Sequence, residues 1–249
     1  MKLFQTWKST DIESLHPTYK YCYGTWQKIH PEWEYKFLDD TQIAEYCKLY
    51  FPEYYEEFIG LPKGILRSDL VRYMILYIEG GLYVDMDFMA LKHHVDIVEL
   101  AKRENKNIVF GKLSRKDIYG DIPNAWMMSL KKHEVFWLFV LREGFARCKC
   151  PEYTIEAKTG PRLISDCLDE YNAKINDILY DKTFQSKSDV LLLPVEYIYP
   201  CDWLNEQTLE YKKLADDNVE HDKVIQMFPN SYAITFWTHN WVDSLNASG

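Results

Sequence analysis

Residues 64–87 read GILRSDLVRYMILYIEGGLYVDMD and carry the strongest structural signal in the chain. Ser68 or Asp69 can open a helix or its first turn, and Gly80-Gly81 predicts the left-handed stop that ends it. Residues 82–84 are rich in strand-forming side chains, so a short strand follows. The apolar residues at helical spacing, which predict one buried helix face, are Leu66, Leu70, Tyr73, Met74 and Tyr77.

Two carboxylates end this stretch. Asp85 and Asp87 are two residues apart, so on an extended backbone their side chains point to the same side. Hard oxygen ligands of this kind suit Mg²⁺ or Mn²⁺.

Asp69 and Arg72 are three residues apart and share a helix face. Their spacing alone indicates no more than a surface ion pair worth roughly 0.3–0.5 kcal/mol.

Composition limits the classes of protein that fit. The chain has 249 residues, 47% of them hydrophobic, which is enough for a well-buried core. Its net charge is −9 and it has no basic run, so nucleic acid is not an expected partner.

Six dispersed cysteines favour reduced thiols over a zinc site or a disulfide scaffold. We found no leader sequence and no apolar run of membrane-spanning length, and therefore expect a cytoplasmic protein without a transmembrane segment.

The order of elements predicts an α/β fold. Residues 2–7 and 33–38 indicate strands, and residues 12–28 and 42–50 indicate helices. Such alternation is typical of a parallel sheet with helices on its faces, which binds ligands at the carboxyl ends of its strands. Trp7, Asp39-Asp40 and the aspartates of residues 85–87 all fall at expected strand ends. Later strands are predicted near residues 107–112, 190–194 and 232–237, residues 122–129 are expected to form a loop that feeds a strand, and later helices are predicted at 133–147 and 162–172.

The central motif closely resembles the signature of the DXD-containing sugar transferases of the family 32 type. The pattern is S-D-x-x-R-Y followed, after a spacer, by G-G-x-Y-x-D-x-D. This family includes yeast-type α-mannosyltransferases and bacterial capsular-polysaccharide transferases, with clostridial glucosylating toxins as distant relatives. Four further segments are similar to family motifs, namely Phe4–Lys8, Leu38–Asp40, Thr159–Pro161 and His239–Trp241. Phe4 stands where histidine is usual, and Leu38 where tryptophan is usual.

The resemblance implies a GT-A fold, a Rossmann-like mixed sheet flanked by helices, in a single domain. The donor nucleotide half would span roughly residues 1–112 and the acceptor half roughly 113–249. A divalent metal, Mn²⁺ or Mg²⁺, would lie between the D-x-D and the diphosphate of a nucleotide sugar. Asp87 would bind it directly, while Asp85 would contact ribose and sugar or reach the metal through water.

The resemblance also implies roles for residues outside the D-x-D. Asp69 and Arg72 would hold the hydroxyls of the donor sugar, and Tyr83 would order the ribose or base side. The implied roles of the remaining residues are a nucleobase contact for Trp7, a sugar contact for Asn124, a further metal or phosphate ligand for His239, and a cover over the closed site for Trp241. Asn124 fits equally well as a turn residue after Pro123.

The resemblance therefore implies a metal-dependent, retaining glycosyltransferase. It would move a hexose from a nucleotide sugar, a UDP-hexose in preference to GDP-mannose, to a hydroxyl of a glycan or other acceptor, as in polysaccharide biosynthesis. Two alternatives stay open. One is a degenerate protein of the same fold that only binds nucleotide sugars or glycans. The other is a metal-dependent phosphoester hydrolase, which usually needs two metals and more ligands than this motif offers.

Overall fold

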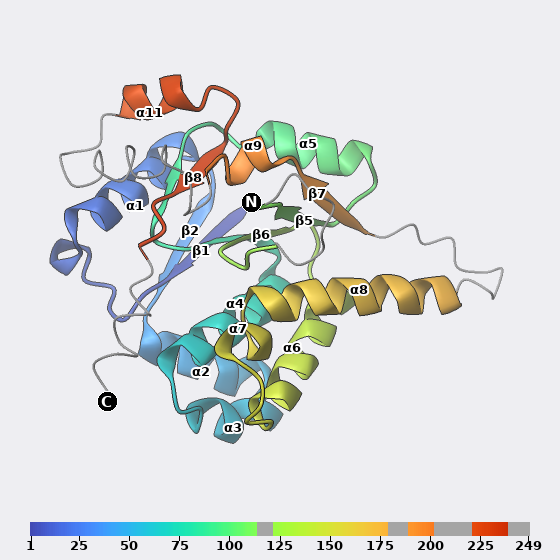
Figure 1. Ribbon diagram of the computed structural model, residues 1–249. Coiled ribbons are helices and arrows are strands. Elements are labelled where there is room, and N and C mark those ends of the chain that lie inside the picture. The colour runs from blue at the N-terminus through green and yellow to red at the C-terminus, as the bar shows by residue number, and fades with distance from the viewer. Residues whose placement is uncertain (114–121, 179–188, 202–220, 239–249) are drawn as a thin grey trace.

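The structure is a computed structural model that describes residues 1–113, 122–178, 189–201 and 221–238 (Figure 1). The strands within these residues are β1 (Lys2–Thr6), β2 (Glu34–Leu38), β3 (Gly81–Val84), β4 (Phe88–Ala90), β5 (Ile108–Gly111), β6 (Trp126–Ser129), β7 (Val190–Leu193) and β8 (Ala233–Thr235). The helices are η1 (Ile12–Ser14), α1 (Pro17–Ile29), α2 (Asp40–Tyr50), η2 (Pro52–Tyr54), α3 (Tyr55–Ile59), α4 (Gly64–Glu79), α5 (Val95–Arg103), α6 (Val135–Cys148), α7 (Ile155–Lys158), α8 (Pro161–Ile178), α9 (Val195–Ile198) and α11 (His221–Met227).

The main sheet has six strands in the order β2-β1-β3-β6-β5-β7. Strand β6 runs antiparallel to both of its neighbours, β3 and β5, whereas the other pairs are parallel. A second, two-stranded antiparallel sheet joins β4 to β8. The predicted α/β class, with a mixed sheet flanked by helices, is confirmed.

Alternating side chains of the sheet separate two apolar layers. Phe4, Tyr83 and Phe110 face the layer of α2, α4, α6 and α8, and their neighbours Leu3, Leu82 and Val109 face the layer of α1, α5 and α9. Figure 1 shows these two groups of helices on opposite sides of the sheet. Because a strand turns successive side chains to opposite faces, each short strand serves both layers. This burial on both faces explains why β3 and β5 read as continuous apolar runs, whereas the edge strand β2 contains charged and partly exposed residues.

Helix α4 begins at Gly64, so the prediction that Ser68 or Asp69 opens it is wrong. Lys63 occupies the N-cap position without a side-chain hydrogen bond, and Ser68 lies in the second turn. Arg67 instead holds the incoming chain by donating from Nη1 to the carbonyl of Leu61 at 2.9 Å. Residues 69–76 are buried on every side of the helix, which is the central helix of its layer.

The D-x-D lies in a turn, not on an extended strand as the spacing suggested. Strand β3 ends at Val84, and the amide of Phe88 donates to the carbonyl of Asp85 at 3.2 Å before β4 begins. Strand β4, which the sequence analysis did not identify, then pairs with β8 near the C-terminus. The turn therefore places the aspartates between the main sheet and the small one.

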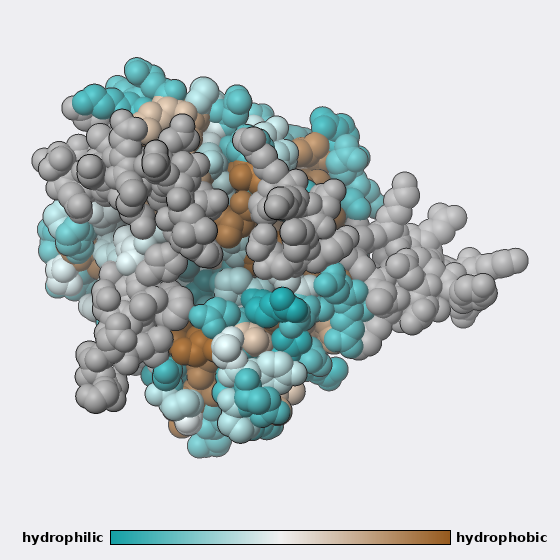
Figure 2. Space-filling model, viewed as in Figure 1, coloured by the Kyte–Doolittle hydropathy of each residue, from teal (hydrophilic) through white to brown (hydrophobic). Residues whose placement is uncertain are grey.

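The outer surface of the described residues is largely polar. Figure 2 shows hydrophilic side chains over much of the visible outer helices, with only small hydrophobic patches between them. Within the described ranges, no helix is both long enough and apolar enough to cross a lipid bilayer.

We predict that Gly81→Ala destabilises the protein by at least about 2 kcal/mol. Gly81 has a φ of +94°, and an added Cβ would lie 2.5 Å from the carbonyl oxygen of Lys2 on the neighbouring strand. The measurement is the free energy of unfolding in urea. The matched control is Gly24→Ala in α1, where a Cβ meets nothing within 4 Å. There the better helix propensity of alanine stabilises by up to about 1 kcal/mol. Equal stability of the two variants would contradict the predicted strain at Gly81.

Candidate active site

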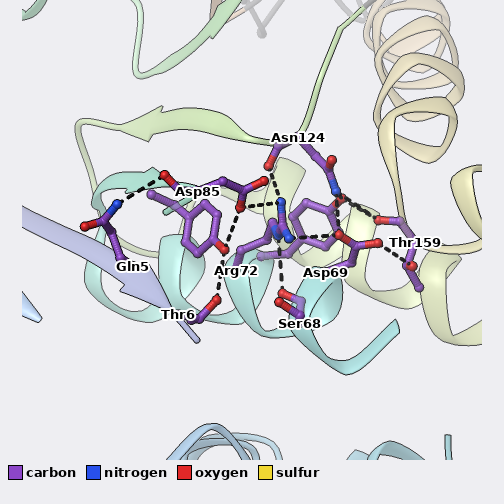
Figure 3. A network of polar contacts seen from close by, with 10 residues as sticks. Gln5, Thr6, Ser68, Asp69, Arg72, Asp85, Asn124 and Thr159 are labelled. Atoms are coloured by element: carbon purple, nitrogen blue, oxygen red, sulfur yellow. Dashed lines mark hydrogen bonds and ion pairs between the residues drawn. The ribbon is translucent and has the colours of Figure 1, made fainter. Parts of the chain in front are cut away.

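A buried guanidinium group lies at the centre of the candidate site. Arg72 is 3% exposed, and its Nη2 is 3.0 Å from Oδ1 of Asp69 while its Nη1 is 3.2 Å from Oδ1 of Asp85 (Figure 3). Nη1 also donates to the carbonyl of Asn124 at 2.7 Å. The guanidinium carbon lies 4.7 Å from the ring centroid of Tyr83. Burial lowers the pKa of Arg72. The surrounding carboxylates and tyrosines raise this pKa by more, so it lies above its usual value. Its charge is therefore permanent.

Asp69 is held by two distant segments of the chain in addition to Arg72 of its own helix. Its Oδ1 accepts from Nδ2 of Asn124 at 2.9 Å, and its Oδ2 accepts from the Thr159 hydroxyl at 2.8 Å. Asn124 precedes β6, and Thr159 lies in the turn between α7 and α8. Tyr73 completes this group, because its hydroxyl donates to the carbonyl of Thr159 and accepts from Asn124. Burial raises the pKa of Asp69 to about 6, while Arg72 favours the ionised form.

Asp85 presents one oxygen to the protein. Its Oδ1 accepts from the Tyr83 hydroxyl at 3.0 Å and pairs with Arg72. Its backbone carbonyl accepts from Nε2 of Gln5 at 3.1 Å. The side chain remains 33% exposed, and Oδ2 has no hydrogen-bond partner among the described residues (Figure 3). Burial raises the pKa of Asp85 to about 6, with Arg72 opposing the shift. Oδ2 is thus available to a ligand.

Asp87 is held by hydrogen bonds instead of by a cation. Its Oδ2 accepts from the backbone amide of Thr238 at 3.0 Å and from the Thr238 hydroxyl at 3.2 Å. Thr238 follows β8, so this support comes from a segment 151 residues away. Burial raises the pKa of Asp87, and the bonds from Thr238 oppose this rise. Within the described residues, no lysine or arginine forms an ion pair with Asp87.

These observations fit a hard divalent cation at the D-x-D. Asp87 has a negative charge that no described side chain neutralises, and Asp85 has an unpartnered oxygen on the other side of a short turn. Carboxylate oxygens are the preferred ligands of Mg²⁺ and Mn²⁺. The further predicted ligand His239, and the predicted cover residue Trp241, lie outside the described residues.

The other predicted residues lie at the same edge of the sheet. Tyr83 is 1% exposed, and its hydroxyl bridges Thr6 and Asp85 at 3.0 Å each, so it supports the site from beneath. Trp7 follows β1 and is half-buried against Tyr19. Asp39, one of the predicted strand-end acids, caps α2 through a capping box with Gln42. The structure therefore gives Asp39 a structural role.

The structure also brings together two histidines and a glutamate outside the D-x-D site. His30, Glu32 and His93 could offer three ligand atoms to one ion. However, the amide of Val95 donates to Nδ1 of His93, so Nε2 carries the proton and donates to Glu32 at 2.7 Å. The group precedes β2, whereas the D-x-D follows β3, so it lies at the opposite end of the strands. We therefore interpret it as a hydrogen-bonded cluster.

Sequence reasoning missed several residues that complete the site. Gln5, Thr6 and Thr159 were recognised only as parts of motifs, and Thr238 was not assigned to the site at all. The one usable signal was the position of Gln5 and Thr6 at the end of β1, beside Trp7. No local pattern indicates the contact of Thr238 with Asp87.

Comparisons with known proteins agree with this geometry. Residues 17–108 match the family model described as "Glycosyltransferase sugar-binding region containing DXD motif". The predicted family resemblance is confirmed. The matched region includes Asp69, Arg72, Asp85 and Asp87, but not Trp7, Asn124, Thr159 or Thr238.

Three curated relatives are similar in sequence to this chain. "Uncharacterized glycosyltransferase L373" of Acanthamoeba polyphaga mimivirus is 26% identical over 74% of this chain and 66% of its own length. "Inositol phosphoceramide mannosyltransferase 3" of Schizosaccharomyces pombe is 35% identical over 34% of this chain and 23% of its own. "Initiation-specific alpha-1,6-mannosyltransferase" of Candida albicans is 32% identical over 36% and 24%. The chain thus spans less than two thirds of the length of each of these relatives.

We predict that Thr159→Val destabilises the protein by about 1–3 kcal/mol at pH 8 and by less at pH 5. The raised pKa of Asp69 means that the folded state binds more protons than the unfolded state between the ordinary pKa and about 6. Losing the Thr159 hydroxyl disfavours the ionised form and raises the pKa of Asp69 further, so the cost is fully present only above the pKa of the variant and is lost as the pH falls through about 6.

The measurement is the free energy of unfolding in urea at both pH values. The control is Thr154→Val, which removes the cap of α7 provided by the bond from Ala157 to the Thr154 hydroxyl. That loss costs about 1 kcal/mol at either pH. A pH-independent cost for Thr159→Val would show that the bond to Asp69 does not affect its charge.

Proposed function

We propose that this protein is a metal-dependent, retaining glycosyltransferase that moves a hexose from a nucleotide sugar to an acceptor hydroxyl. The observation that carries the proposal is the meeting of Asp69, Arg72, Asp85 and Asp87 at the carboxyl edge of β1 and β3. Ligands of α/β sheets bind at this edge. The family match and the printed names of the relatives support the transferase class.

Each carboxylate would have its own task in the reaction. Asp87 and Asp85 Oδ2 would hold Mn²⁺ or Mg²⁺, which when bound neutralises charge on the nucleoside diphosphate leaving group. Arg72 would keep Asp85 ionised and oriented, because its Nη1 is 3.2 Å from Oδ1. Asn124 and Asp69 would face the donor sugar. Trp7 would border the nucleobase. Fixed charges of this kind act without reorganisation during the reaction.

The two alternatives are less well supported. A hydrolase with two metals needs further ligands near the D-x-D. Among the described residues, the group of His30, Glu32 and His93 could offer three ligand atoms, but it lies at the opposite end of the strands. A degenerate binding protein would not need the D-x-D arrangement seen among the described residues. There Asp85 has an oxygen without a partner, and Asp87 beside it has no cationic partner.

We predict that Asp87→Asn lowers sugar transfer by at least about 100-fold while the fold is retained. Removing the charge of Asp87 weakens the cation site, and the amide preserves the shape and the bonds from Thr238. The measurements are transfer from the donor identified below and Mn²⁺-dependent nucleotide binding. The control is Glu99→Gln, an exposed carboxylate on α5 that pairs with Lys102. Transfer at the parent rate by Asp87→Asn would exclude this residue as a metal ligand.

The donor can be identified by thermal shift against a panel of UDP- and GDP-sugars. A ligand that binds only the folded state raises the unfolding temperature by mass action. We expect a UDP-hexose, but the yeast relatives are named mannosyltransferases, so GDP-mannose is the competing donor. We predict a shift with one nucleotide class in Mn²⁺ that EDTA abolishes. Binding without transfer to any hydroxyl acceptor would favour the degenerate protein. Release of phosphate from a simple phosphoester would favour the hydrolase.

A further inference from the structure

An aromatic cluster packs beside the D-x-D at the ends of β1 and β2. Its members, which we call the platform cluster, are buried Leu15, Tyr19 and Met86 with partly buried Trp7, Ile12, Tyr23 and Phe37. Met86 is the residue between the two aspartates, and only 2% of it is exposed. The cluster therefore packs against the turn that carries the proposed metal ligands.

Tyr19 is the member of the platform cluster that contacts both Trp7 and Thr238, the residue that holds Asp87. Its ring lies 4.7 Å from that of Trp7, centroid to centroid, at an angle of 51°. Its hydroxyl donates to Oγ1 of Thr238 at 2.9 Å. The side chain is 4% exposed and comes from the first turn of α1. One buried residue thus contacts the proposed nucleobase platform and the residue that holds Asp87.

The hydrogen-bond chain has a fixed direction. The hydroxyl of Thr238 has one proton, which it donates to Oδ2 of Asp87 at 3.2 Å. Tyr19 must therefore be the donor in its bond to Thr238. The tyrosine fixes the rotamer of Thr238, and Thr238 holds Oδ2 of Asp87 through its amide and its hydroxyl. Outer partners of this kind orient metal ligands and affect metal affinity.

We propose that Tyr19 is a positioning residue that couples the nucleobase platform at Trp7 to the metal ligand Asp87 through Thr238. This inference rests on the proposed function, in which Asp87 binds the metal. A base that settles on Trp7 fixes the ring of Tyr19, and this ring fixes the carboxylate by way of Thr238. Nucleotide and metal would then bind more tightly together than separately, because each stabilises the arrangement that the other needs.

The decisive variant is Tyr19→Phe, which retains the ring and deletes the bond to Thr238. We expect Mn²⁺ affinity, measured by the electron paramagnetic resonance signal of free Mn²⁺ with excess uridine or guanosine, to fall roughly 3- to 10-fold. Binding of the corresponding nucleoside, uridine or guanosine, should not change, since the contact with Trp7 remains. A loss of both affinities together would indicate a general structural defect and would overturn the proposal.

Substitutions of Thr238 test whether Tyr19 acts on Asp87 through this residue. Thr238→Val should weaken Mn²⁺ binding by about 10-fold, and Thr238→Ser, which keeps the hydroxyl, should restore it. In Tyr19→Phe/Thr238→Val the tyrosine substitution should add nothing, because its partner is already absent. Additive losses would show that Tyr19 does not act through Thr238.

The matched control is Tyr23→Phe. Tyr23 belongs to the same helix and the same cluster, but its hydroxyl accepts from Gln27 at 2.8 Å. Its loss should leave Mn²⁺ affinity unchanged. Asp87→Asn separates the two possible failures. If it retains Mn²⁺ affinity, the proposed metal site is wrong. If it loses that affinity and Tyr19→Phe does not, only the coupling is wrong.

Discussion

The charge of Arg72 is the constraint on which the site depends. A guanidinium cannot lose its proton inside a protein, so a buried arginine requires anions and carbonyl groups around it. Asp69 from the same helix and Asp85 from the end of β3 supply the anions, and Asn124 supplies a carbonyl. Removing either acid leaves the buried guanidinium with a single anionic partner, so the charge is only partly compensated. The network that arranges the site therefore also stabilises the junction of α4 with the sheet.

The two aspartates of the D-x-D are consequently unequal. Asp85 has a cationic partner and uses Oδ1 for it, whereas Asp87 has hydrogen bonds from Thr238 and, among the described side chains, no cation. Repulsion between the two carboxylates adds to the raised pKa of Asp85. An added divalent cation would relieve both the repulsion and the uncompensated charge of Asp87. This asymmetry gives a physical reason to expect Asp87 to be the principal ligand.

The sequence was informative wherever the controlling interactions are local. The glycine stop at Gly80, the strand before Asp85 and the shared helix face of Asp69 and Arg72 all follow from short-range rules. It was misleading at the start of α4, because Arg67 and burial replace a capping side chain there. It missed the bonds from Thr159 to Asp69 and from Thr238 to Asp87, which join residues 90 and 151 positions apart. The interpretation of Asp69 and Arg72 as a surface pair failed because periodicity does not reveal a helix buried on every side.

The burial of Asp69 restricts how a sugar can reach it. Both of its oxygens already accept protein hydrogen bonds, and 4% of the residue is exposed. A sugar hydroxyl can bond to Asp69 only if it shares an oxygen with Asn124 or Thr159 or displaces one of them. Thr159 belongs to the turn between α7 and α8, in the predicted acceptor half of the chain. A donor that displaces Thr159 would therefore also move this turn. If Asp69 recognises the donor sugar as proposed, this carboxylate would link the sugar to the segment expected to face the acceptor.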